Sequence, residues 1–409
     1  MPHNRSMILT LTLLASCTGR NSQQTDGAAA LDVSRSSDTT SETDSQPPAC
    51  TSLKQLGRVS LDVSTNSKWS LQVVEGGEGF VVAWHTQPVY ASSLTGQLRL
   101  AFVDRQAKTK TPNGIDIGAD NFGLRPSLFA RSGIVSVLYQ PASGRQVHLK
   151  QLDAQGNTLR DQEIALPSSG GPPTDATIRA AAIAPYGHDK VAALLAIQSL
   201  YPRLVTISDV GEVTVLHDMV TNQTVSSVSL KRRADRILAT YQTINDQATH
   251  HMLGLASTVD KLVERGKGEV THATARDSAY EILPSGAAAL FRDRANDLYL
   301  QTFADDGTAF DNPKLLAKSV RAESYALAWG DGKLWLATER PANAGQHQLQ
   351  ALDSHGNPIG NAQPLQSCAG EPSAISMVWL DDRLAIVTAN ETIGDGSQSA
   401  VCVVVMGCQ

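Results

Sequence analysis

Aromatic residues make up only 5% of this 409-residue chain, so it has few rings on which a base or a sugar could stack. Basic residues are not in excess either, because 34 Lys and Arg face 40 Asp and Glu, for a formal net charge of −6. Nucleic-acid-binding proteins carry a dense basic patch, so we expect no nucleic-acid partner. Beyond the N-terminus, no apolar run approaches the roughly 20 residues that span a bilayer.

Sequence signatures of catalysis are also missing. No G-x-S-x-G nucleophile elbow and no C-x-x-C pair occurs, and His250 and His251 are adjacent, so they point to opposite faces of a strand. The S-x-D-x-G-x-x-W boxes of propeller sialidases and the Trp that follows the turn in quinone-enzyme repeats are absent. We therefore predict no catalytic residue, no metal site and no cofactor.

The N-terminus is typical of an export signal. Arg5 gives a positive start, residues 7–15 form a short apolar segment, and Leu14-Ala15-Ser16-Cys17 resembles the bacterial lipobox. This resemblance predicts lipidation of Cys17; cleavage by ordinary signal peptidase is the alternative. Thr18 follows in place of the Asp that tends to hold enteric lipoproteins at the inner membrane, which favours the outer membrane.

A polar segment follows the signal. Residues 18–49 are rich in Ser, Thr and acids, with no aromatic side chain, and cannot bury enough apolar surface to offset their ordering entropy. We therefore predict a signal peptide at residues 1–17, a disordered tether at 18–49 and a single folded domain at 50–409.

Short apolar runs separated by Gly, Asp, Asn and Pro make up the rest of the chain, which is typical of strands and turns. An aliphatic strand followed by a polar turn recurs about every 50 residues. Its copies are marked by Val103, Leu152, Ile207, Phe303 and Leu352, and the double gap before Phe303 holds a degenerate copy at residues 255–260.

Each unit contains strand a, a tight turn, strand b, a loop, strand c, an Asp/Gly turn and strand d. Four strands in about 50 residues match a β-propeller blade, and residues 50–409 accommodate seven units. The predicted fold class is all-β, a seven-bladed β-propeller with four-stranded blades. Two stacked β-sandwich domains are the alternative.

The last unit offers only three strands after Cys368. Residues 56–63 precede the first full unit and alternate Val59, Leu61 and Val63 with polar residues. We expect this N-terminal strand to close the last blade as its outer strand.

Four cysteines, Cys50, Cys368, Cys402 and Cys408, flank that composite blade, and an even set in an exported protein predicts two disulfides. Three pairings are possible. A neighbouring antiparallel strand that begins near Cys50 starts where the strand ending at Cys408 stops, which favours Cys50–Cys408 and leaves Cys368–Cys402.

The unit resembles the repeat of seven-bladed propeller lipoproteins of large-genome Gram-negative bacteria, including myxobacteria. Its clearest copy is residues 291–299, Phe-Arg-Asp-Arg-Ala-Asn-Asp-Leu-Tyr. The resemblance covers residues 66–409 and implies no agreed activity.

The loops between strands b and c vary most, and variable loops on a rigid scaffold tend to carry recognition. They begin at His85, Gln140, Gln242, Arg292, Glu339 and Asn390. The densest charged set on them, and hence the candidate ligand-binding set, is Arg292, Asp293, Arg294, Glu339 and Arg340.

We expect a monomeric, non-enzymatic binding or scaffold module at the cell envelope, held to the membrane by its N-terminal lipid. An envelope protein or a glycan would bind on the b–c loop face. An extracellular polysaccharide hydrolase or lyase, using acids such as Asp293, Asp297, Glu339 and Asp395, is one alternative. An outer-membrane assembly scaffold is another.

Overall fold

The computed structural model describes residues 50, 52–88, 95–121, 127–141, 147–164, 178–187, 189–197, 201–219, 223–244, 248–257, 262–273, 278–339, 346–368, 371–391 and 398–408. The signal peptide, Cys17 and the tether expected at residues 1–49 lie outside this set, as do Arg340 and Asp395. The folded unit begins at Pro48.

Strands form nearly all of the regular structure. In chain order they are β1 (Leu53–Ser64), β2 (Asn66–Glu75), β3 (Gly79–Pro88), β4 (Thr95–Asp104), β5 (Ile115–Asn121), β6 (Ser127–Arg131), β7 (Ile134–Tyr139), β8 (Val147–Leu152), β9 (Thr158–Ile164), β10 (Ile178–Tyr186), β11 (Lys190–Ile197), β12 (Tyr201–Ile207), β13 (Val213–Asp218), β14 (Thr224–Arg233), β15 (Arg236–Ile244), β16 (Ala248–Ser257), β17 (Leu262–Ala273), β18 (Ala279–Leu283), β19 (Gly286–Arg292), β20 (Leu298–Phe303), β21 (Lys314–Ala317), β22 (Tyr325–Gly330), β23 (Lys333–Glu339), β24 (His347–Leu352), β25 (Pro358–Leu365), β26 (Glu371–Leu380), β27 (Arg383–Glu391) and β28 (Ser399–Cys408). Within the described part of the chain, no helix has the length and apolar character needed to cross a membrane.

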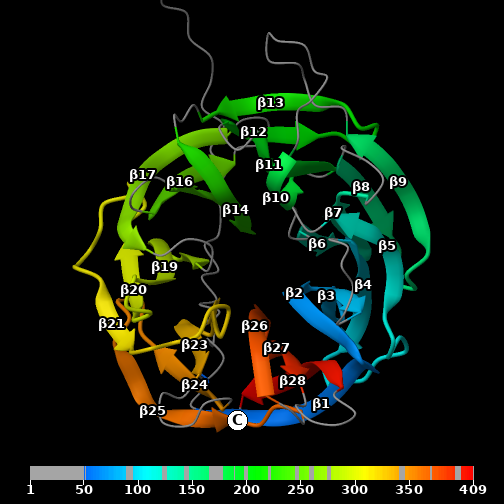
Figure 1. The fold of residues 1–409 in the computed structure, drawn as a ribbon. Coiled ribbons are helices and arrows are strands. Elements are labelled where there is room, and N and C mark those ends of the chain that lie inside the picture. Colours follow the sequence, from blue (N-terminus) through cyan, green and yellow to red (C-terminus); the bar gives the residue numbers. More distant parts are fainter. Residues whose placement is uncertain are drawn as a thin grey trace, which may run out of the picture. The chain divides into compact units, whose positions relative to one another are not determined.

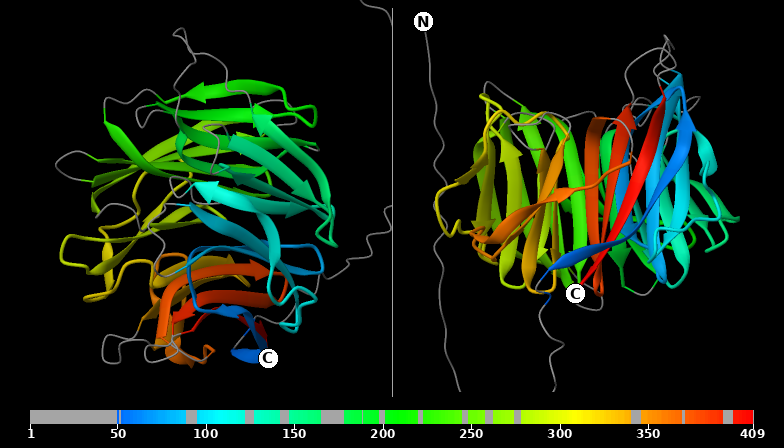
Figure 2. Two further views of the ribbon diagram at one scale, coloured as in Figure 1. Left: turned by 45° about the vertical axis from the view of Figure 1, so that its right-hand side comes forward. Right: turned by 90° about the horizontal axis from the view of Figure 1, so that it is seen from below.

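The strands pair into seven antiparallel sheets of four strands each. The sheets are arranged as blades around one axis, and strand a of each blade, which is β26 in blade seven, lies innermost (Figure 1). This confirms the seven-bladed propeller and rules out the two-sandwich alternative. Seen from the side, the strands run between two faces (Figure 2). We call the face with the a–b and c–d turns the turn face, and the opposite one the loop face.

The ring closes as the sequence predicted. Blade seven has the order β1-β28-β27-β26, so the N-terminal strand is its outer edge, with Leu53 opposite Cys408. A buried lysine adds to this closure. The Lys68 Nζ lies 3.5 Å from the Asp62 carboxylate and donates to Ser64 Oγ at 2.8 Å and to Ser399 Oγ at 3.4 Å. One ammonium thus ties β1, β2 and β28 together.

Both predicted disulfides are present. Cys50 is bonded to Cys408, and Cys368 to Cys402. Cys50 lies on the turn face, where its backbone N–H donates to Asp331 Oδ2 at 2.6 Å. Each disulfide fastens the composite blade at a different point.

The core lies between adjacent blades, because each sheet packs both of its faces against neighbours. Second strands are therefore apolar along their length, as in β11 and β19, rather than alternating. The polar turns that mark the repeat are fixed by side chains. In the turns after β8 and β24, Asp153 and Asp353 each accept two backbone N–H bonds through Oδ1.

Five of the six predicted b–c loops begin later than expected, and two of them by three residues or more. Strands β3 and β15 continue to Pro88 and Ile244, which places His85 and Gln242 inside strands. Their partners in β4 and β16 extend the ladders to the same depth. The loop face is therefore less irregular at these blades than the loss of apolar periodicity indicated.

Candidate binding site

The seven inner strands, β2, β6, β10, β14, β18, β22 and β26, surround an axial channel (Figure 1). Two cavities occupy it. The chamber, of about 280 Å³, lies in the half toward the loop face; the mouth, of about 610 Å³, lies toward the turn face. Gln72, Lys231 and Ser376 line both cavities, so the two are continuous.

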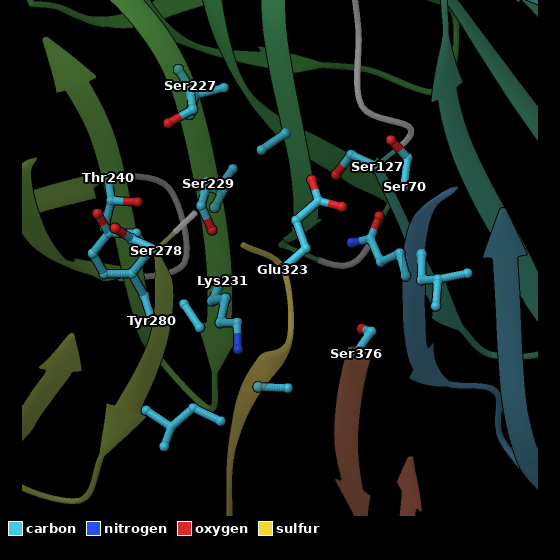
Figure 3. A pocket seen from close by; sticks show the side chains of 18 of the residues that line it. Ser70, Ser127, Ser227, Ser229, Lys231, Thr240, Ser278, Tyr280, Glu323 and Ser376 are labelled. Carbon is cyan, nitrogen blue, oxygen red and sulfur yellow. The ribbon is translucent and has the colours of Figure 1, made fainter. Parts of the chain in front are cut away.

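Hydroxyl groups dominate the polar lining of the chamber (Figure 3). Tyr241 and Tyr325 also line the chamber, and the hydroxyls labelled in Figure 3 belong to Ser70, Ser127, Ser227, Ser229, Thr240, Ser278, Tyr280 and Ser376. Five blades contribute to this set, and blade six adds the carboxylate of Glu323. The small side chains follow from the geometry, because seven strands converge near the axis and leave little room there.

Two chamber residues have a left-handed backbone, which is uncommon for residues other than glycine. Ser70 has φ 51° and lies at the register shift between Trp69 and Gln72, so a β-bulge redirects this part of β2. Glu323 has φ 58°, and its carbonyl accepts a 2.9 Å hydrogen bond from the Ile375 N–H of blade seven. Such strain tends to gather at ligand sites.

Several hydroxyls are oriented by neighbouring groups. Ser127 Oγ accepts the Ile183 N–H at 2.8 Å, which joins blades two and three, and Ser227 Oγ donates to Gln242 Oε1 at 3.2 Å. Burial raises the pKa of the Tyr280 phenol, although hydrogen bonds to Ser278 and Thr240 act in the opposite direction. Tyr280 therefore stays protonated at neutral pH.

The charged residues predicted to bind a ligand on the b–c loops have different roles in the structure. Arg292 is buried, and its Nη1 donates to Asn296 Oδ1 at 2.8 Å and to the Val320 carbonyl at 3.0 Å. Asp293 Oδ1 accepts the backbone N–H groups of Ala295 and Asp297 and so shapes the turn after β19. These two side chains hold the loop itself.

Glu339 is also buried, and its carboxylate pairs with the Arg321 guanidinium at 2.8 Å and 2.9 Å. Arg294 is exposed on the loop after β19, and Arg340 lies outside the described residues. Of the acids considered for hydrolysis, Asp293 and Asp297 belong to one tight turn, while Glu339 is held by its arginine.

Sequence reasoning missed the chamber. Its residues come from short segments of all seven blades, at positions about 50 residues apart, so no local motif contains them. A weak signal existed in the alternation of Ser227 and Ser229 along β14, because alternate residues of a strand share one face.

No protein-family model matches the chain, and no curated protein matches it. Among solved structures, it is similar to the WD40 domain of SCAP from fission yeast, with 8% identity, 87% of this chain and 98% of that chain covered, and a TM-score of 0.43. It is similar to a neuraminidase-like protein of a flat-faced bat strain from Peru, with 11% identity, 88% and 96% covered, and a TM-score of 0.45. It is also similar to the SapL1 lectin in complex with alpha methyl fucoside, with 11% identity, 82% and 95% covered, and a TM-score of 0.41.

Proposed function

We propose that this protein is a non-enzymatic binding module of the bacterial cell envelope that takes a hydroxyl-rich ligand, the end of a glycan chain, into the chamber. The observation that carries the proposal is the ring of hydroxyl groups from five blades, with the Glu323 carboxylate among them. Each serine hydroxyl can donate one hydrogen bond and accept two. Sugar hydroxyls have the same dual character, so a ring of this kind matches them from several directions.

The charge of the lining supports a neutral ligand. Glu323 and Lys231 are the two ionisable side chains of opposite sign among the chamber residues. A carboxylate can accept hydrogen bonds from two adjacent sugar hydroxyls, and an ammonium can donate to others. One charge of each sign gives no net preference for an anion or a cation.

The envelope location rests on the N-terminal sequence and the cysteines. We propose that Cys17 is lipidated and that residues 18–49 tether the propeller to the outer membrane, as the lipobox resemblance implies. Two disulfides agree with an exported protein, because such bonds persist in oxidising compartments. An envelope protein bound on the loop face is the alternative partner.

A glycan-binding panel with the purified domain tests the proposal. Variants Glu323→Gln and Ser229→Val should weaken binding of the best glycan about tenfold each, because the first replaces a charged acceptor by a neutral amide and the second removes a hydroxyl group from the chamber. Arg294→Ala, on the exposed loop after β19, is the matched control and should leave affinity unchanged. Loss of binding in Arg294→Ala alone would move the site to the loops. Turnover of a glycan that Asp293→Asn or Glu339→Gln abolishes would favour a hydrolase.

A further inference from the structure

The mouth differs from the chamber in chemistry as well as in position. Its volume of about 610 Å³ is within the range of small-molecule sites. Ser376 lines the mouth as well, but charged and aromatic side chains make up much more of its lining, among them Glu75, Arg233, Trp329, Trp379 and Asp381. The glycan proposal uses none of these groups.

The charges around the mouth are segregated by blade. Three consecutive basic residues, Lys231, Arg232 and Arg233, end strand β14 of blade four. The acids Asp331, Asp381 and Glu75 come from blades six, seven and one, which follow one another around the ring. Glu281 of blade five also lines the mouth and pairs with Lys231, so the blade-four side carries three basic groups against one acid, whereas the side formed by blades six, seven and one is anionic.

Most of these charges are already engaged. Lys231 Nζ pairs with the Glu281 carboxylate at 2.9 Å, and the Asp381 carboxylate pairs with Arg105 at 2.6 Å. Arg232 donates to the Pro185 carbonyl at 2.9 Å and to the Ala234 carbonyl at 2.8 Å.

Glu75 and Arg233 differ from that set. Burial raises the pKa of the Glu75 carboxyl, and the nearby charges of Asp381 and Glu281 add to this shift, while Arg233 opposes it. Asp331 accepts the Cys50 N–H and Asp381 pairs with Arg105, whereas among the described residues the charge opposing that of Glu75 is the nearby guanidinium of Arg233.

Arg233 is exposed and supplies the opposite charge. Its guanidinium lies over the Trp329 ring, 5.7 Å from the ring centroid, and Nη1 donates to the Ile282 carbonyl at 3.2 Å. A guanidinium has five N–H donors, so most of them are left for a ligand.

The aromatic wall between the two charges is fixed in place. Trp379 stacks on Trp335 at 5.8 Å with an interplanar angle of 6°. Its ring also covers Gly330, where a Cβ atom would lie 1.9 Å from the indole. Only a residue without a side chain fits there, so the Trp379 ring is held against the backbone of β22.

We propose that the mouth binds a short peptide with free termini, whose ammonium group lies at Glu75 and whose carboxylate lies at Arg233. A cavity with an anionic side, a cationic side and apolar rings between them is complementary to a dipolar chain with a carbon backbone. The peptide carboxylate and the Arg233 guanidinium would form a charge-assisted pair, for which the guanidinium geometry allows two parallel N–H···O hydrogen bonds. The mouth and the chamber use different residues for their ligand contacts. The peptide proposal can therefore be refuted while the glycan proposal stands, and the reverse.

Titration calorimetry with the disulfide-intact domain tests this site. The probes are alanyl-leucyl-alanine, its N-acetyl form, which lacks the ammonium, and its C-terminal amide, which lacks the carboxylate. We expect the free tripeptide to bind and each capped form to bind about tenfold more weakly, since each has lost one charged contact.

Matched variants connect each ligand terminus to its residue. Glu75→Gln should weaken the free tripeptide about tenfold and leave the N-acetyl form unchanged, because that form makes no ammonium contact. Arg233→Gln should likewise weaken the free tripeptide about tenfold and leave the C-terminal amide unchanged, because the amide makes no carboxylate contact. Arg233→Lys, which keeps the charge and serves as a folding control, should retain most of the affinity, and the thermal melting curve of each variant should match that of the wild type. Equal affinity for all three probes, no binding of the free tripeptide, or binding that neither variant alters would overturn the proposal.

Discussion

The Nε2 atom of His85 lies 2.6 Å from Oδ2 of Asp120, and both side chains are fully buried. The two residues belong to β3 and β5, so their contact spans the intervening strand β4 of blade one. The second carboxylate oxygen, Asp120 Oδ1, accepts the Gln140 N–H of blade two at 2.9 Å. One carboxylate thus braces a blade internally and joins it to the next.

Replacing Asp120 by Ala should lower the free energy of unfolding by about 2–4 kcal/mol, because the change removes a buried partner from two polar groups. Urea denaturation followed by tryptophan fluorescence measures this loss. Asp311→Ala, at an exposed position after β20, is the control and should change stability by less than about 0.5 kcal/mol. A similar effect of both substitutions would contradict the bracing role.

Acid should destabilise the propeller through His347. Burial lowers the pKa of this imidazole to about 4, against a smaller opposing effect of Glu339 and a reinforcing one of Arg321. Between pH 6.5 and 4 the unfolded chain therefore binds more protons at this residue than the folded one. Its contribution is complete above about pH 6.5 and declines by up to about 3 kcal/mol as the pH falls toward 4.

Unfolding free energies at pH 7, 5.5 and 4.5 test this dependence. His347→Gln should show a shallower loss of stability over that range than the wild type. His355→Gln, at an exposed turn position, should retain the wild-type slope. Parallel curves for the wild type and His347→Gln would mean that other groups control acid unfolding.

The two disulfides should differ in their contribution to stability. Cys50 and Cys408 are separated by 358 residues, whereas Cys368 and Cys402 are separated by 34. The entropy that a cross-link removes from the unfolded chain grows with the logarithm of loop length, which makes the first bond about 2 kcal/mol more stabilising. Denaturation midpoints of the two paired Cys→Ser variants test this order, and equal midpoints would contradict it.

Membrane attachment should depend on Cys17. Bacterial lipoproteins carry two or three acyl chains, and each buried CH₂ group contributes about 0.8 kcal/mol to membrane binding. The full chain should therefore partition into the detergent phase after expression in a Gram-negative host. Cys17→Ser should remain an uncleaved precursor or appear in the aqueous phase. Identical aqueous partitioning of both proteins would refute lipidation.

The ring could be predicted from sequence because its repeating parts are chemically marked. Turns such as those at Asp153 and Asp353 need a side-chain acceptor and a glycine, and these residues recur at the blade period. Strand β1 could be assigned to blade seven because the last unit lacked one strand. The disulfide pairing followed from the same strand order.

The site was harder to predict because its residues gather only when the ring closes. The b–c loops are rich in charge, which pointed to Arg292 and Glu339 as ligand-binding residues, yet both are buried and bonded to neighbouring groups of the protein. Ser229 and Glu323 are far apart in sequence and common in type, so neither stands out alone. Glu75 and Arg233 face one cavity from blades one and four, a relationship that no sequence spacing encodes.

The position of β1 also bears on how the protein is made. Ribosomes synthesise β1 first and its partner β28 last, so the first strand must wait for the whole domain before it can pair. Until then β28 is absent and the two ends of the nascent ring remain open edges that invite wrong partners. A chain that stopped before Ser399 would lack the strand that joins β1 to β27. The native ring is therefore available only to chains that extend through β28.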